Sequence, residues 1–174
     1  MIKQLMCATV LVLLGPSAWQ ATVLAEEGRE HSVQTVIQSR TFTIPAGRCP
    51  QLPANVEVRG LGVERTTTTI EGADDRGEDR GKTGLRGSVL SRISGAATDN
   101  LGGTYTFSYQ LKYSSPIPGT GIVTDTFRLT GNGVANGMST FFKATVDFDS
   151  GFNPLFETFH LLEQSGDPFV CDPL

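Results

Sequence analysis

The stretch TYTFSYQLKY, residues 104–113, alternates almost without error between large apolar and polar side chains. Tyrosine, phenylalanine or leucine occupies each odd-numbered position, and threonine, serine, glutamine or lysine occupies each even-numbered one. A period of two places the two sets on opposite faces of an extended strand. The stretch therefore predicts an antiparallel strand with one buried face.

The next two apolar segments continue this pattern. Residues 121–130 place Val123, Asp125, Phe127 and Leu129 on one face, and residues 138–149 predict a further strand. Glycine with asparagine or aspartate at 98–103 and 131–137 is typical of tight turns. The expected inward residues of the later strand are Met138, Thr140, Phe142, Ala144, Val146 and Phe148.

The flanking segments predict further strands with weaker patterns: one at 40–44, one at 56–70 that Gly60 and Gly62 interrupt, and one at 88–95 that should form a hairpin with 104–113. Residues 66–69 are threonines, polar on both faces, which indicates an edge or rim strand. Residues 155–163 are apolar on both faces, which indicates a strand covered on both sides or crossing between sheets. Prolines make residues 49–53 an expected rigid, extended connector, and prolines with glycines make 114–121 an expected loop. The fold class is all-β, with about eight strands in a single antiparallel barrel or a two-sheet sandwich.

Length and charge limit the possible classes of protein. A chain of 174 residues is expected to form one domain, and 20 glycines with 9 prolines suit many short strands and turns. The formal net charge of −4 gives no footprint for nucleic acid or for an anionic membrane. We therefore expect no nucleic-acid partner.

Residues 1–25 have the pattern of a secretory signal peptide. Lys3 precedes an apolar run at 5–14, and Ala25 ends the best small-residue cleavage site. Ten apolar residues are too few to span a bilayer, although an uncleaved anchor is the alternative. We expect residues 26–174 to form a secreted or periplasmic domain with no stable membrane insertion after cleavage.

The predicted cleavage site decides which cysteines remain in the exported domain. Cys7 leaves with the signal peptide, so that Cys49 and Cys171 remain, and two cysteines in an exported domain most often pair. Closing so long a loop stabilises the fold by up to ~5 kcal/mol in the chain-entropy model. Two free thiols are the alternative.

Residues 71–87 are rich in charge and glycine and almost free of apolar side chains, which predicts a mobile hairpin loop. Four of its five acids could bind calcium, but Arg76 and Arg80 are interleaved with them, and the spacing is not that of a calcium loop. We expect neither a metal nor a cofactor. These acids are Asp74, Asp75, Glu78 and Asp79.

Asp125 lies in line with core-facing residues, and a buried carboxylate must be paired, hydrogen-bonded or protonated. It is either a structural carboxylate or a polar group at the floor of a ligand cavity. The aromatic residues on the same face either fill the core or line that cavity. The candidate ligand-binding residues are Tyr105, Tyr109, Tyr113, Asp125, Phe127 and Phe142.

An enzyme is not expected. Glu157 and His160 are three residues apart on a predicted strand and so face opposite ways, and no nucleophile elbow or phosphate-binding loop is present. The predicted function is a non-catalytic binding module for a small apolar ligand. The alternative is a surface or structural protein that meets other macromolecules through its sheet edges or the 71–87 loop.

Six short motifs occur along residues 49–173: CPQLP at 49–53, GAATD at 95–99, YTFSY at 105–109, DTFRLTGNG at 125–133, GDP at 166–168 and CDP at 171–173. Together they resemble a family of small exported bacterial β-proteins of unknown function. The resemblance implies export and pairing of Cys49 with Cys171, and it implies no activity.

Overall fold

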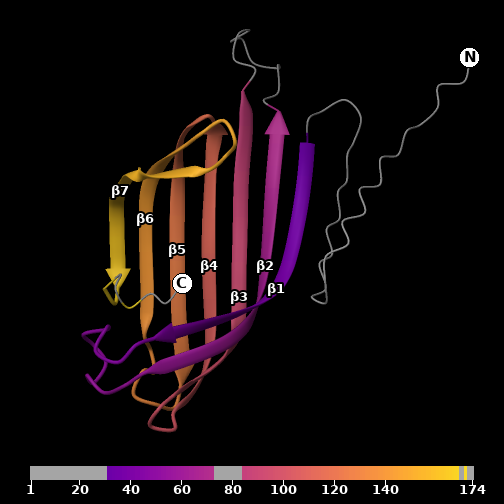
Figure 1. Ribbon diagram of the computed structural model, residues 1–174. Coiled ribbons are helices and arrows are strands. Elements are labelled where there is room, and N and C mark those ends of the chain that lie inside the picture. The colour runs from indigo at the N-terminus through magenta and orange to yellow at the C-terminus, as the bar shows by residue number, and fades with distance from the viewer. Residues whose placement is uncertain (1–30, 73–83, 169–170, 172–174) are drawn as a thin grey trace, which may run out of the picture.

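The computed structural model describes residues 31–72, 84–168 and 171, and in this part the chain forms a single antiparallel sheet (Figure 1). Each strand pairs with its neighbours in sequence, so that the spatial order is also the chain order. The all-β prediction is confirmed, with seven strands described where about eight were expected. They are β1 (His31–Ile44), β2 (Val58–Gly72), β3 (Leu85–Asp99), β4 (Thr104–Ile117), β5 (Gly119–Gly131), β6 (Ser139–Phe148) and β7 (Pro154–Gly166).

The sheet is curved and open. β1 and β7 are its two edges and do not pair with each other, so the described strands do not close into a barrel. Figure 1 shows the lower parts of β1 and β2 bending across the front of the other strands. This bend covers one end of the concave face.

Glycines in β2 make the bend sterically possible. A Cβ at Gly60 would collide with the ring of Phe42, and one at Gly62 would lie 2.6 Å from the carbonyl oxygen of Ser94 and 2.7 Å from Phe107 Cζ. The sequence predicted that these glycines interrupt the strand, but β2 is continuous through both. They instead allow the hairpin to pack directly on the sheet.

The main core lies under this bend, and we call it the packed end. Phe42 contacts Phe107 and Phe127 edge-on, with ring centroids 4.8 and 5.6 Å apart. Such edge-to-face contacts add to the free energy gained by burying the rings. The packed end comprises Phe42, Ile44, Val56, Val58, Phe107, Phe127 and Leu129, all buried.

The disulfide predicted between Cys49 and Cys171 is confirmed, and both residues are buried within the same core cluster. It joins the connector after β1 to the tail after β7, across 122 residues of sequence. The bridge therefore ties together the two segments that follow the edge strands. The predicted signal peptide lies outside the described residues, and no helix in the described ranges is long and apolar enough to cross a membrane.

Several other local predictions are wrong. The connector at 49–53 is not extended but forms successive turns, with Leu52 N donating to Cys49 O and Val56 N to Pro53 O. The threonines at 66–69 lie in β2, which pairs on both sides, because β1 extends well beyond its predicted start. β7 is an edge strand and most of its side chains are exposed, so it is not covered on both sides as its apolar residues predicted.

Other local predictions hold. The alternation at 104–113 continues through β4 with its odd-numbered side chains inward, and β3 and β4 form the expected hairpin. Asp99 closes their turn by accepting hydrogen bonds from the backbone amides of Leu101 and Gly103. In contrast, the prediction of a loop at 114–121 is wrong, because β4 runs to Ile117 and β5 begins at Gly119.

Candidate ligand-binding face

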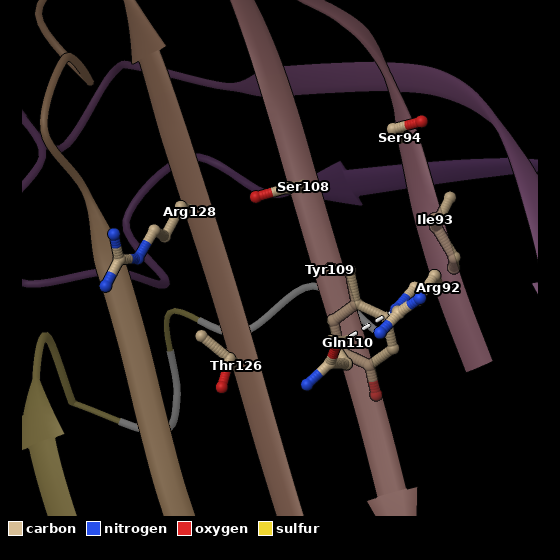
Figure 2. Close-up of a pocket in the computed structure, with 8 residues that line it drawn as sticks. All are labelled: Arg92, Ile93, Ser94, Ser108, Tyr109, Gln110, Thr126 and Arg128. Carbon is tan, nitrogen blue, oxygen red and sulfur yellow. Dashed lines mark hydrogen bonds between the residues drawn. The ribbon is translucent and has the colours of Figure 1, made fainter. Parts of the chain in front are cut away.

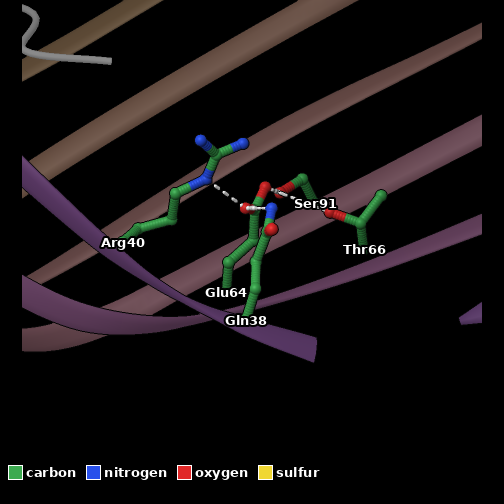
Figure 3. Close-up of polar contacts among 5 residues, drawn as sticks. All are labelled: Gln38, Arg40, Glu64, Thr66 and Ser91. Carbon is green, nitrogen blue, oxygen red and sulfur yellow. Dashed lines mark hydrogen bonds and ion pairs between the residues drawn. The ribbon is translucent and has the colours of Figure 1, made fainter. Parts of the chain in front are cut away.

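Polar side chains lie on the concave face next to the packed end, and we call them the polar belt. The belt comprises Gln38, Arg40, Glu64, Thr66, Ser91, Tyr109 and Asp125. Figure 3 shows its part around Glu64 on β2. This carboxylate accepts hydrogen bonds from Gln38 Nε2 at 2.6 Å, Arg40 Nε at 2.5 Å and Ser91 Oγ at 2.7 Å. Thr66 donates to it from the next inward position of the same strand. A carboxylate only 7% exposed thus gains donors from three neighbouring strands.

The ionised form of Glu64 is favoured by these donors. Burial alone would raise its pKa, but the hydrogen bonds from Arg40, Ser91, Gln38 and Thr66 outweigh burial and lower the pKa to about 2. Glu64 is therefore negatively charged at neutral pH. Arg40 lies beside this carboxylate as its counter-charge.

The belt continues on β4 and β5 through Tyr109 and Asp125. The Tyr109 hydroxyl donates to Asp125 Oδ2 at 2.5 Å, and Asp125 is 4% exposed. The strand register places Leu111 and Phe142 directly opposite Asp125. The two carboxylates of the belt thus lie on the same face of the sheet, on β2 and β5.

Beside and beyond the belt, the concave face stays partly exposed, and we call this region the open strip. Its apolar side chains have the same inward parity as those of the packed end, yet each is only half-buried. They come from β1 and β2 on one side of β3 and from β4 and β5 on its other side. The open strip comprises Val36, Ile70, Leu111, Tyr113 and Val123.

An aromatic cluster bounds the open strip at its far end. The Tyr113 ring stacks on Phe148 with centroids 5.3 Å apart, and Phe152 packs against both rings. The Phe152 ring also occupies the space that a Cβ at Gly87 would need. Partial burial raises the pKa of the Tyr113 hydroxyl, which therefore stays neutral.

The six predicted ligand-binding residues all face the concave side, but the structure places them at different depths. Tyr105 and Phe127 are buried in the packed-end core, and the Tyr105 hydroxyl donates to Asp99 and accepts from Ala135 N. Tyr109 and Asp125 belong to the belt. Tyr113 lies at the open strip, and Phe142 is buried beside the exposed Phe159 of β7. Their role in binding stays a prediction.

The sequence did not single out Glu64 or Arg40. Glu64 has the inward parity of β2, and that alternation alone was a usable signal for a buried carboxylate. Its donors could not be found in the same way, because they depend on the register of β1 and β3 against β2. No group of three or more histidine, cysteine, aspartate or glutamate side chains in the described ranges is arranged to hold a metal ion.

A scan of family models, a search of curated proteins and a search of solved structures each return no match to this chain. The family resemblance stays a prediction. The function is therefore argued from the residues of this chain alone.

Proposed function

We propose that this chain is an extracytoplasmic, non-catalytic binding module that holds a small apolar ligand against the open strip. The observation that carries the proposal is the half-buried state of Leu111, Tyr113 and Val123 on a concave face whose other end is fully packed. A ligand placed there would remove their remaining apolar surface from water, which favours binding.

The polar belt defines which ligand fits best. Asp125 lies directly opposite Leu111 in the sheet, and Glu64 is ionised, so two carboxylates adjoin the apolar strip. Hydrogen-bond donors on a ligand would be attracted to these oxygens, whereas a ligand carboxylate would be repelled. The preferred ligand is apolar with a neutral or cationic hydrogen-bond donor at one end.

Export supports this assignment. The signal-peptide pattern of residues 1–25 predicts secretion, and the Cys49–Cys171 disulfide is typical of proteins in oxidising compartments. The intact mass of the protein purified from culture supernatant or periplasm would test cleavage after Ala25. A mass that retains residues 1–25 would contradict export by a cleaved signal.

The binding proposal is tested with Nile red, a neutral apolar dye, titrated into the mature protein and then displaced. We expect saturable fluorescence enhancement, and stronger displacement by dodecanol than by dodecanoate because of the belt carboxylates. Native mass spectrometry without reductant would detect a ligand retained from the host. No saturable dye binding together with a ligand-free mass would overturn the proposal.

Two matched variants locate the site. Val123→Thr introduces a hydroxyl into the open strip, and Val63→Thr makes the same change at an exposed position of β2 on the opposite face. We expect Val123→Thr to weaken Nile red binding about fivefold or more, since a hydroxyl in an apolar contact costs ~1–2 kcal/mol. Val63→Thr should bind like wild type. Equal weakening in both would place the dye elsewhere.

The second candidate is a surface protein that meets another macromolecule through a sheet edge. The exposed apolar side chains of β7 favour it, with Phe156 75% exposed and Phe159, Leu161 and Leu162 also exposed. An open edge strand can pair with an added strand of a partner. Phe156→Lys should abolish such pairing and leave Nile red binding unchanged. Most of the 71–87 loop lies outside the described residues.

A further inference from the structure

The convex face of the sheet carries a positive surface that the net charge of the chain conceals. The outward positions of β2–β6 hold carboxylates only at strand ends, at Glu71 and Asp147. Three outward cations have an acidic residue beside them. Arg59 forms an ion pair with Glu57. In the strand register, Arg86 lies opposite Glu71 and Lys143 lies opposite Glu163. The other four are Arg65, Arg92, Lys112 and Arg128, which we call the basic band.

The basic band has no counter-charge among the described residues. All four side chains are exposed, and none forms an ion pair with a described carboxylate. Arg65 and Arg92 lie directly opposite each other on β2 and β3. Like charges in that position destabilise a sheet, so the arrangement is unfavourable unless an external anion compensates it.

A depression of about 450 Å³ lies within the band (Figure 2). Arg92 lies on one side, where its Nε donates to Gln110 Oε1 at 3.1 Å, and Arg128 lies on the other. The remaining outward side chains that line the depression are hydroxyl-bearing. These are Ser94, Ser108 and Thr126, and together with Gln110 they line the depression with neutral donors and acceptors.

We propose that the basic band binds an acidic polysaccharide segment, with Arg92 and Arg128 on its carboxylate or sulfate groups and the hydroxyls and Gln110 on its sugar hydroxyls. Guanidinium groups bind oxyanions through paired, charge-assisted hydrogen bonds. This site is on the face opposite to the open strip and does not depend on the ligand proposed there.

The lining argues for a glycan over other polyanions. Single-stranded nucleic acids are held by rows of aromatic side chains that stack on bases, and no aromatic side chain is among the outward residues that line the depression. A flat bilayer surface would not enter a depression, whereas a sugar ring with one anionic group can. The serine and threonine hydroxyls match neutral sugar hydroxyls better than they match phosphates alone.

Binding is tested by calorimetry at low and physiological salt with oligogalacturonate, dextran sulfate and neutral dextran as probes. We expect an acidic probe to bind with an affinity that falls as salt rises, and neutral dextran not to bind. The stronger of the two acidic probes identifies carboxylate or sulfate as the recognised group. Absence of binding to both acidic probes would overturn the proposal.

The variant Arg92→Gln/Arg128→Gln should weaken binding of the acidic probe at least about tenfold, through loss of charge-assisted contacts. Arg59→Gln is the matched control, because Arg59 is an outward cation of the same sheet that already has a carboxylate partner. It should bind within about twofold of wild type. An equal loss in both would mean non-specific charge attraction and would overturn the site.

Two further probes separate the other polyanions. A twelve-nucleotide poly-dT and phosphatidylglycerol vesicles are offered under the same conditions. Binding of either as tight as that of the acidic glycan would overturn the glycan assignment. Thermal unfolding of each variant, expected within a few degrees of wild type, confirms that the sheet is intact.

Discussion

The packed end and the open strip are built from the same strands and have the same kind of inward side chain, yet only the packed end is fully covered. At the packed end, Phe42 and Ile44 of β1 fold back over Phe107 and Phe127 of the sheet. At the open strip, side chains such as Val123 remain half-buried. The difference shows that alternation decides which face of a strand is apolar, whereas the bending of neighbouring strands decides whether that face is covered.

Removing the disulfide should break the packed end most severely. We expect Cys49→Ser/Cys171→Ser to lower the free energy of unfolding by about 4 kcal/mol, because the bridge closes a loop spanning 122 residues of sequence. Urea unfolding without reductant would measure the loss. Wild type with reductant should match the variant, and a loss below about 1 kcal/mol would show that the bridge contributes little to the packed end.

A pair of aromatic truncations compares the two regions directly. Phe127→Ala removes a ring that is 0% exposed and should cost about 4 kcal/mol, since the rigid surroundings leave a cavity. Tyr113→Ala removes a half-buried ring and should cost about half as much. The same urea experiment serves both. Equal losses would mean that the two regions are packed alike.

Acid should destabilise the polar belt between the two regions. The lowered pKa of Glu64 contributes stability that is fully present above its ordinary value of 4.5 and is lost as pH falls toward about 2. Because Arg40 is half exposed, we expect only about 2 kcal/mol from this effect. Glu64→Gln should therefore lose less stability than wild type between pH 5 and pH 2, measured by urea unfolding across that range.

Arg40→Gln provides the check on this assignment. Removing the Arg40 donor should raise the pKa of Glu64 and move the acid-induced loss of stability to higher pH. If the free energy of unfolding falls with pH in the same way for Arg40→Gln and wild type, another carboxylate governs the loss of stability in acid.

The smallest effect is expected behind the two regions, on the convex face. Arg65→Thr removes one of two arginines that lie directly opposite each other and should raise stability by about 0.5 kcal/mol in low salt. The gain should disappear at high salt, where surface charges are screened. A loss of stability in low salt would show that the Arg65 side chain contributes packing that outweighs repulsion.

Much of the sheet could be predicted from the sequence because its signal is local. The alternation in 104–113 and in the two segments after it gave the correct inward residues of β4, β5 and β6. Two paired cysteines also followed from local composition and the predicted export. The strand inferences need only neighbouring residues, and the cysteine inference needs only composition, so neither depends on knowing the register of the sheet.

The missed features depend on contacts between distant residues. The bend of β2 depends on Phe42 occupying the space above Gly60, which no local pattern reveals. The basic band depends on the register that sets Arg65 opposite Arg92, and the belt depends on the register that brings Gln38 and Ser91 to Glu64. Net charge concealed the band because it sums all charges of the chain, wherever they lie.

The strictly sequential strand order has a consequence for how the chain reaches this structure. Every strand pairs with its neighbour in sequence, so each hairpin can form as soon as its own residues are available. The contact of Phe42 with Phe127 must wait until β5 exists, and the bridge must wait for Cys171, which follows β7. The Cys49–Cys171 bond can therefore form only after all seven described strands have been made, whereas the hairpins of the sheet need no such wait.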